Sequence, residues 1–123
     1  MTEGLRFRFG RTADWRASIE DSREPSSIWA LPVNRQDGSS EEDYILLSRL
    51  VNSATGNPVV LVAGLKHFGT EAGAKFLVKP DLRAEVLSKL PRGWSEKNLQ
   101  IVLHARVYGN SPARPEVMRW HSW

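Results

Sequence analysis

The sequence predicts an α/β or α+β fold: a mixed β-sheet of about five to six strands, a β-α-α-β crossover and flanking antiparallel hairpins. Three observations predict this class. Apolar and polar residues alternate in 5–9 and 98–108, which is typical of half-buried strands. The unbroken apolar run 59–64 is typical of a central strand. Between 59–64 and 98–108, the segments 70–79 and 81–90 carry apolar residues at helical spacing.

The first part of the chain predicts three short strands. In "LRFRF" (5–9) the apolar residues point to one side and the arginines to the other. The segment "WRASIED" (15–21) predicts a second short strand. "SIWALP" (27–32) predicts a third, which ends at Pro32.

A polar loop is expected next. The segment "NRQDGSSEED" (34–43) consists of turn-forming residues. Its last part, "SSEED" (39–43), brings three carboxylates together. Because consecutive side chains of an extended chain point in alternating directions, we expect a solvated acidic loop here and not a divalent-cation site.

The middle of the chain predicts an antiparallel hairpin. The segment "DYILLSRLV" (43–51) contains four consecutive apolar residues, which predicts burial on both faces. "NSATGNP" (52–58) is rich in turn formers and joins this segment to 59–64. Two apolar runs joined by such a turn are typical of a hairpin.

Two helices follow the hairpin. We expect Thr70 to be the N-cap of the first helix, 70–79, and Pro80 to end it. Asp81 is the expected N-cap of the second helix. The buried stripe of that helix is expected to comprise Leu82, Val86 and Leu90.

The C-terminal part predicts a second hairpin. The alternating segment "NLQIVLHARVY" (98–108) is followed by a turn at 109–115 and by a final strand, "EVMRWHSW" (116–123). A strand, a helical crossover and another strand favour a parallel unit with a right-handed connection. We therefore expect 59–64 and 98–108 to lie side by side and to point the same way.

The loop between 59–64 and the first helix is the candidate binding site. Ligands of open α/β sheets sit at the carboxyl ends of parallel strands, and free N–H groups at a helix N-terminus attract anions. The residues expected to bind a small anionic molecule are Gly64, Lys66, His67, Gly69 and Thr70. The alternative is a structural strand-to-helix turn, because the loop lacks both G-x-G-x-x-G and G-K-[ST] spacing.

Composition argues against several other functions. The twelve arginines and five lysines are scattered among fourteen acidic residues, so nucleic-acid binding is not expected. Cysteine is absent and the three histidines lack metal-ligand spacing, so we expect no metal site and no cofactor. No nucleophile elbow is present, and we expect no catalytic residue. No apolar run reaches the ~20 residues of a membrane span, which argues against membrane contact by this segment.

Four motifs carry a resemblance to a known group of proteins: "EDY" (42–44), "AGL" (63–65), "GTEA" (69–72) and "NLQIVL" (98–103). With them, the chain resembles the C-terminal domain of uncharacterised bacterial proteins that often carry an upstream membrane span or winged-helix DNA-binding domain. The resemblance covers nearly the whole chain and implies one α/β domain, 1–123. It further implies a fragment that lacks a preceding β-α unit, on the cytoplasmic side or, in a membrane-anchored parent, on either side of the membrane.

Four functions are compatible with these observations. The first is a non-enzymatic sensory or regulatory domain that binds a small anion at 64–70. The second is a self-association module that dimerises through sheet edges, because a sheet that lacks a strand exposes an unpaired edge. The third is an enzyme acting on a phosphorylated or nucleotide-like substrate, and the fourth is nucleic-acid binding through the N-terminal arginines.

Overall fold

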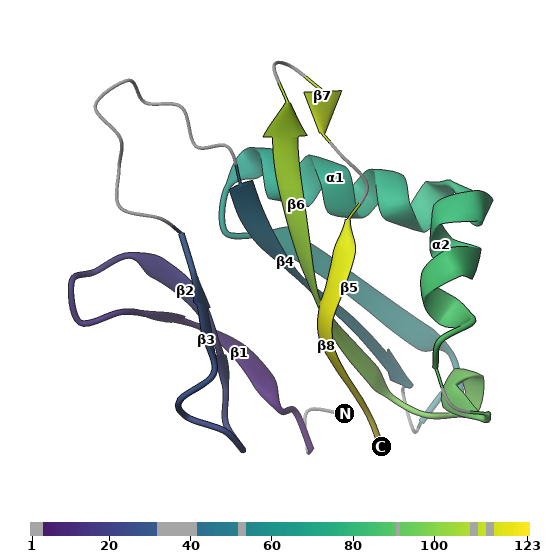
Figure 1. The fold of residues 1–123 in the computed structure, drawn as a ribbon. Helices are drawn as coiled ribbons and strands as arrows, with labels where there is room; N and C mark the ends of the chain where they lie inside the picture. The colour runs from purple at the N-terminus through teal and green to yellow at the C-terminus, as the bar shows by residue number, and fades with distance from the viewer. Residues whose placement is uncertain (1–3, 32–41, 52–53, 91, 109–110, 113–114) are drawn as a thin grey trace.

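The computed structural model describes residues 4–31, 42–51, 54–90, 92–108, 111–112 and 115–123 (Figure 1). The chain is α+β, with two antiparallel sheets and two α-helices, which confirms the predicted class in this coarser form. Its elements, in chain order, are β1 (Phe7–Arg11), β2 (Ala17–Asp21), β3 (Ile28–Ala30), β4 (Glu42–Val51), β5 (Pro58–Gly64), α1 (His67–Val78), α2 (Pro80–Leu87), the 3-10 helix η1 (Trp94–Glu96), β6 (Leu99–Tyr108), β7 (Ser111–Pro112) and β8 (Glu116–Ser122).

The main sheet has the strand order β5-β4-β6-β8, and the two-residue β7 pairs with the end of β6. Each neighbouring pair is antiparallel. Both predicted hairpins are confirmed, since β5 pairs with β4 and β8 pairs with β6. The predicted loop 34–43 lies mostly outside the described residues, and its last two residues already belong to β4.

The expectation that 59–64 and 98–108 lie side by side is wrong. Strands β5 and β6 run the same way, but β4 lies between them and is antiparallel to both. The reason is the apolar content of β4. Ile45 and Leu47 are buried on the face toward the helices, while Leu46 is buried on the opposite face. A strand that is apolar on both faces is most stable in the middle of a sheet.

Helices α1 and α2 cover one face of the main sheet (Figure 1). The first helix begins at His67, three residues before the predicted N-cap Thr70. Pro80 ends α1 as expected and is also the first residue of α2, where its missing N–H has no cost. Val86 is buried, and Leu82 and Leu90 pack beside it, as the predicted stripe requires.

The helix-side cluster is the larger part of the core. It comprises Ile45, Leu47, Ala72, Phe76, Val86, Leu99, Ile101, Leu103 and Ala105. Leu99, Ile101, Leu103 and Ala105 of β6 belong to it, while Val102 belongs to the opposite face. The alternation predicted for 98–108 is therefore confirmed over 99–105, and the side chains of 107 and 108 lie outside the described part.

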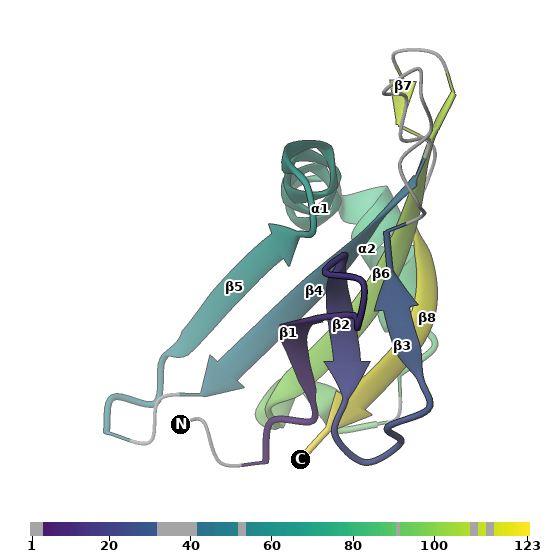
Figure 2. The same cartoon turned by 90° about the vertical axis from the view of Figure 1, so that its left-hand side faces the viewer.

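The small sheet, with the order β1-β2-β3, packs on the other face of the main sheet through Phe7, Ile19, Leu46 and Val102 (Figure 2). Gln100 of β6 connects the main sheet to the small sheet by hydrogen bonds. Its side-chain oxygen accepts hydrogen bonds from the N–H groups of Arg6 and Phe7 at 2.8 and 2.9 Å. The same side chain donates to the Phe7 carbonyl at 3.0 Å. Strand β5 lies beyond the edge of the small sheet, so the small sheet does not cover it.

No helix in the described part of the chain is long and apolar enough to cross a membrane.

Candidate functional site

The loop from β5 to α1 is closed by its own hydrogen bonds. The Gly64 N–H donates to the Thr70 hydroxyl at 2.9 Å, and the Thr70 N–H donates to the Lys66 carbonyl at 3.2 Å. Thr70 therefore lies inside the first turn of α1 and ties the end of β5 to the helix. The N-cap position belongs to Lys66, whose side chain makes no capping bond.

The N–H groups expected to bind an anion already have an acceptor, the carboxylate of Asp43. Asp43 lies on β4, is fully buried, and accepts the Lys66 and Gly69 N–H groups at 2.9 Å each. Its other oxygen accepts the N–H groups of Leu65 and Tyr44 at 3.1 and 2.8 Å. An internal carboxylate thus occupies the position at which an external anion was predicted.

The electrostatics of Asp43 are a balance between burial and hydrogen bonding. Burial raises the pKa of this carboxyl above its ordinary value, while the four backbone N–H donors oppose the shift. The expectation that 39–43 is a solvated acidic loop is wrong for Asp43. The sequence did hold a signal for this, because Asp43 directly precedes the apolar run of β4.

The two glycines of the loop are required by its tight closure around Asp43. A Cβ atom on Gly69 would lie 2.1 Å from the Asp43 Oδ2 atom. A Cβ atom on Gly64 would lie 2.6 Å from backbone atoms of Gly69 and Thr70. Both glycines thus have a structural reason to be present that involves no ligand.

The structure places Gly64 at the end of β5, Lys66 at the N-cap and Gly69 and Thr70 in the first turn of α1, while the side chain of His67 lies outside the described part. Anion binding by this loop stays a prediction. Its backbone donors at Lys66 and Gly69 are taken, so an external anion would have to displace Asp43 or use side chains alone.

A pair of titratable side chains, His104 and Glu42, lies on the face of the main sheet opposite the helices. His104 Nε2 is 2.8 Å from a carboxylate oxygen of Glu42, and the His104 ring lies 4.9 Å from the ring of Tyr44. His121 is instead stacked on Trp123 at 5.1 Å. No group of three or more His, Cys, Asp or Glu residues able to hold a metal ion exists among the described residues.

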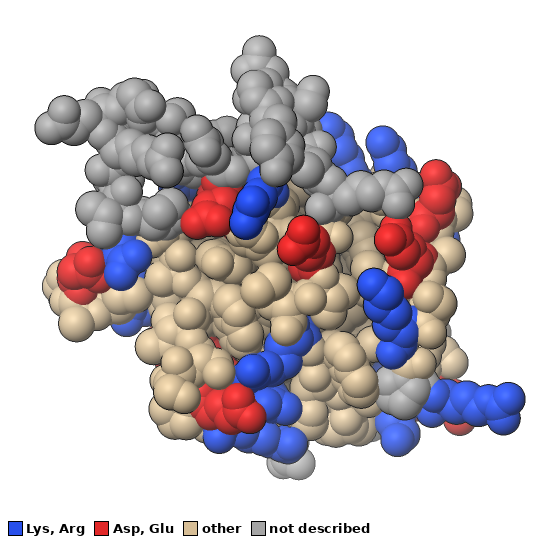
Figure 3. All heavy atoms as spheres, in the orientation of Figure 1, with Lys and Arg blue, Asp and Glu red and all other residues tan. Residues whose placement is uncertain are grey.

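The N-terminal arginines are largely paired with acids. Arg6 donates to Asp21 through two nitrogen atoms at 2.9 Å each, and Arg119 reaches the same buried carboxylate at 2.9 Å. Arg8 lies 3.3 Å from Glu20. Basic and acidic side chains are intermixed on the face shown in Figure 3. On that face, the described residues do not form the continuous basic surface that nucleic-acid binding requires.

The open edge of the main sheet is a further candidate site. Strand β5 pairs with β4 on one side, and no strand among the described residues pairs with its other side. Its residues Val59, Val60 and Leu61 are 38, 45 and 58% exposed. The strand has no charged residue, the usual device that keeps edge strands from pairing with another chain.

No protein-family model matches the chain, and neither the curated proteins nor the solved structures include a match to it.

Proposed function

We propose that the chain is a non-catalytic interaction domain that self-associates through β5. The observation that carries this proposal is an uncharged edge strand with three consecutive exposed apolar side chains. The backbone N–H and C=O groups on the open side of such a strand are a template for another strand. A second copy supplies a strand of the same length and composition.

The side chains of β5 favour a second copy as the partner. Val59 and Leu61 point to the same face of the sheet, because side chains alternate along a strand. That face is opposite α1, against which Val62 packs, and the small sheet does not reach it (Figure 2). In an antiparallel pair of β5 strands, apolar side chains meet apolar side chains and no like charges oppose each other.

The other functions have weaker support. An anion at 64–70 competes with Asp43 for the same backbone donors. Catalysis on a phosphorylated substrate needs an activated nucleophile or a phosphate cradle, and the described residues provide no such arrangement. Among the described residues, the His104 ring is hydrogen-bonded to the Glu42 carboxylate and to no hydroxyl group.

The experiment is a mass measurement over a range of protein concentrations, by sedimentation equilibrium or light scattering. We expect the unmodified chain to form a dimer and Leu61→Lys to shift it to the monomer, because the substitution places two ammonium groups beside each other in the paired strands. Val78→Lys is the matched control, since Val78 is 73% exposed on α1. Circular dichroism verifies that both variants are folded.

A monomeric mass at every concentration would contradict the proposal. So would an unchanged dimer in the Leu61→Lys variant, which would place the interface on another surface.

A further inference from the structure

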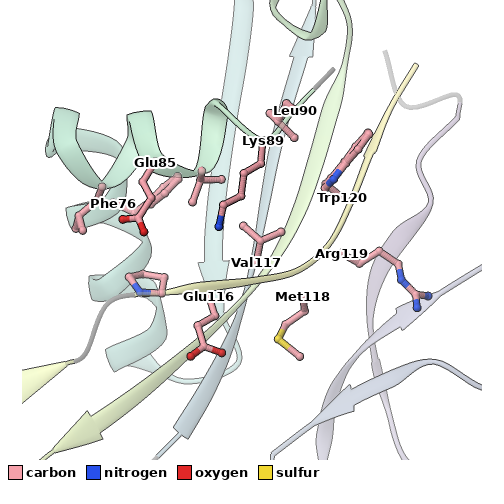
Figure 4. Close-up of a pocket in the computed structure, with 12 residues that line it drawn as sticks. Phe76, Glu85, Lys89, Leu90, Glu116, Val117, Met118, Arg119 and Trp120 are labelled. Carbon is pink, nitrogen blue, oxygen red and sulfur yellow. The ribbon is translucent and has the colours of Figure 1, made fainter. Parts of the chain in front are cut away.

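A cleft lies between α2 and β8, on the side of the molecule away from the small sheet (Figure 4). Its volume is about 630 Å³, within the range of pockets that hold small ligands. One wall is formed by the apolar stripe of α2 with Phe76 of α1, and the other by β8. The apolar side chains that line it are Phe76, Leu82, Val86, Leu90, Val117 and Trp120.

The cleft exists because β8 is at the edge of the sheet. In Figure 1 the helices lie over β4, β5 and β6, and α2 stands apart from β8. Val117 packs partly against the helix-side cluster, and Trp120 is registered with Ile101, so both lie on the helix side of β8. Phe76 and Val86 are buried and form an apolar floor.

The lining also carries four charged residues, Glu85, Lys89, Glu116 and Arg119, and Lys89 is the cation among them without an ion pair to a described residue. Figure 4 shows Lys89 extending from the end of α2 toward the space between α2 and β8. Its ammonium group forms no ion pair with another described residue. The other cation of the lining, Arg119, is bound by Asp21 and Glu24 at 2.9 and 2.7 Å.

The acidic residues of the lining leave the ammonium group accessible. Glu116 projects from β8 on the side opposite Val117 (Figure 4). Glu85 has an interaction of its own and forms no ion pair with Lys89, although the two residues are one helical turn apart. Within the described part of the chain, the cleft therefore combines an apolar floor with one positive charge, Lys89, that has no ion pair.

We infer that this cleft binds a small amphipathic carboxylate. Its apolar chain or ring lies against Phe76, Val86 and Trp120, and its carboxylate pairs with the Lys89 ammonium group. The apolar contact supplies most of the affinity, because an exposed ion pair contributes little. The inference does not depend on self-association, since β5 is the opposite edge strand of the main sheet.

The probes are hexanoate and octanoate, titrated while the backbone and indole N–H signals are followed by NMR. We expect shifts at Val86, Val117 and the Trp120 indole. Each added CH₂ group is expected to strengthen binding about fourfold, as burial of apolar chain predicts. Octylammonium, which has the same chain and the opposite charge, is expected to bind more weakly.

Two variants locate the contacts. Lys89→Gln is expected to weaken octanoate binding up to about fivefold, the effect of losing an exposed ion pair. Lys75→Gln is the control, since Lys75 pairs with Glu71 on α1 and should leave binding unchanged. Val117→Phe narrows the cleft at the β8 wall and is expected to weaken octanoate binding.

The absence of shifts at cleft residues with millimolar octanoate would overturn the inference. Equal binding of octylammonium, or no effect of Lys89→Gln, would overturn the assignment of a carboxylate. Unchanged octanoate affinity in Val117→Phe would place the site elsewhere. A monomeric Leu61→Lys variant that still binds octanoate would separate this inference from the proposed self-association.

Discussion

Replacement of Asp43 by alanine is expected to be among the most destabilising single changes in the chain. It leaves the N–H groups of Tyr44, Lys66 and Gly69 without their acceptor. It also removes one of the two acceptors of the Leu65 N–H, which keeps the Tyr44 carbonyl at 3.0 Å. Hydrogen bonds to a charged group contribute about 1.5–3 kcal/mol each, but the cost of burying the carboxylate offsets part of this, as its raised pKa indicates. Roughly 1 kcal/mol for each of four bonds gives a loss of about 4 kcal/mol.

The assay is urea denaturation at neutral pH, monitored by tryptophan fluorescence and circular dichroism. Asp81→Asn is the control, because Asp81 is exposed on α2 and its loss is expected to change the free energy of unfolding by less than about 0.5 kcal/mol. Asp43→Asn retains one oxygen but turns an NH₂ group toward two N–H donors, so we expect a loss of about 2–4 kcal/mol.

The alanine variant also tests the loop as an anion site. Once the Asp43 side chain is removed, the N–H groups of Lys66 and Gly69 are free to donate hydrogen bonds to a small carboxylate. Sodium formate is expected to raise the denaturation midpoint of Asp43→Ala more than sodium chloride does, and to leave the unmodified chain without a specific effect. A loss of stability below about 1 kcal/mol in Asp43→Ala, or equal effects of the two salts, would refute this reasoning.

Three further predictions concern stability. Gly69→Ala is expected to lower the free energy of unfolding, measured by urea denaturation, by more than about 2 kcal/mol, because the new Cβ atom meets the buried Asp43 carboxylate. Gly10→Ala is the control and is expected to lower it less, because its Cβ atom meets only the flexible end of the Glu20 side chain. Phe76→Ala is expected to cost about 3–5 kcal/mol, and a value under about 1.5 would show that the ring is not in the core. Asp21 is fully buried, which opposes its ionisation, but hydrogen bonds from two arginines outweigh burial and lower its pKa. The ionised Asp21 carboxylate therefore stabilises the folded chain above pH ~4, and this stabilisation is lost as the pH falls. We expect the urea denaturation midpoint of Asp21→Asn to fall less between pH 6 and pH 3 than the midpoint of the unmodified chain does.

Most of the strands could be predicted because the signal lies in the local sequence. The alternation in β6 reflects two different neighbours, the helices at Ile101 and the small sheet at Val102. The order of the strands is a tertiary property and was predicted less well. Both β5 and β6 are apolar, so the parallel arrangement looked equally favourable from sequence. The sequence predicts that β4 is buried on both faces, and this property favours the observed position of β4 between β5 and β6.

The loop after β5 could likewise be predicted only in part. Its position between a strand and a helix could be predicted from Gly64, Gly69 and the apolar run before them. The group that occupies it, Asp43, lies 26 residues before Gly69 and reaches the loop only because β4 and β5 are paired. Thr70 is a good N-cap residue by type, but its hydroxyl is already taken by the Gly64 N–H. Such competition between partners depends on distances that a sequence does not contain.

The hydrogen bonds between Gln100 and the small sheet affect the order in which the chain folds during its synthesis. Arg6 and Phe7 are made first, yet the side chain that holds their backbone lies 94 and 93 residues later. At about 5–20 residues per second, roughly 5–20 s of synthesis separate the two. During that interval Phe7 and Ile19 can contact Leu46 of β4 but lack Val102 of β6, the other buried main-sheet residue of their cluster. The contact of Gln100 with Arg6 and Phe7 therefore forms only after β4 and β5 have been made.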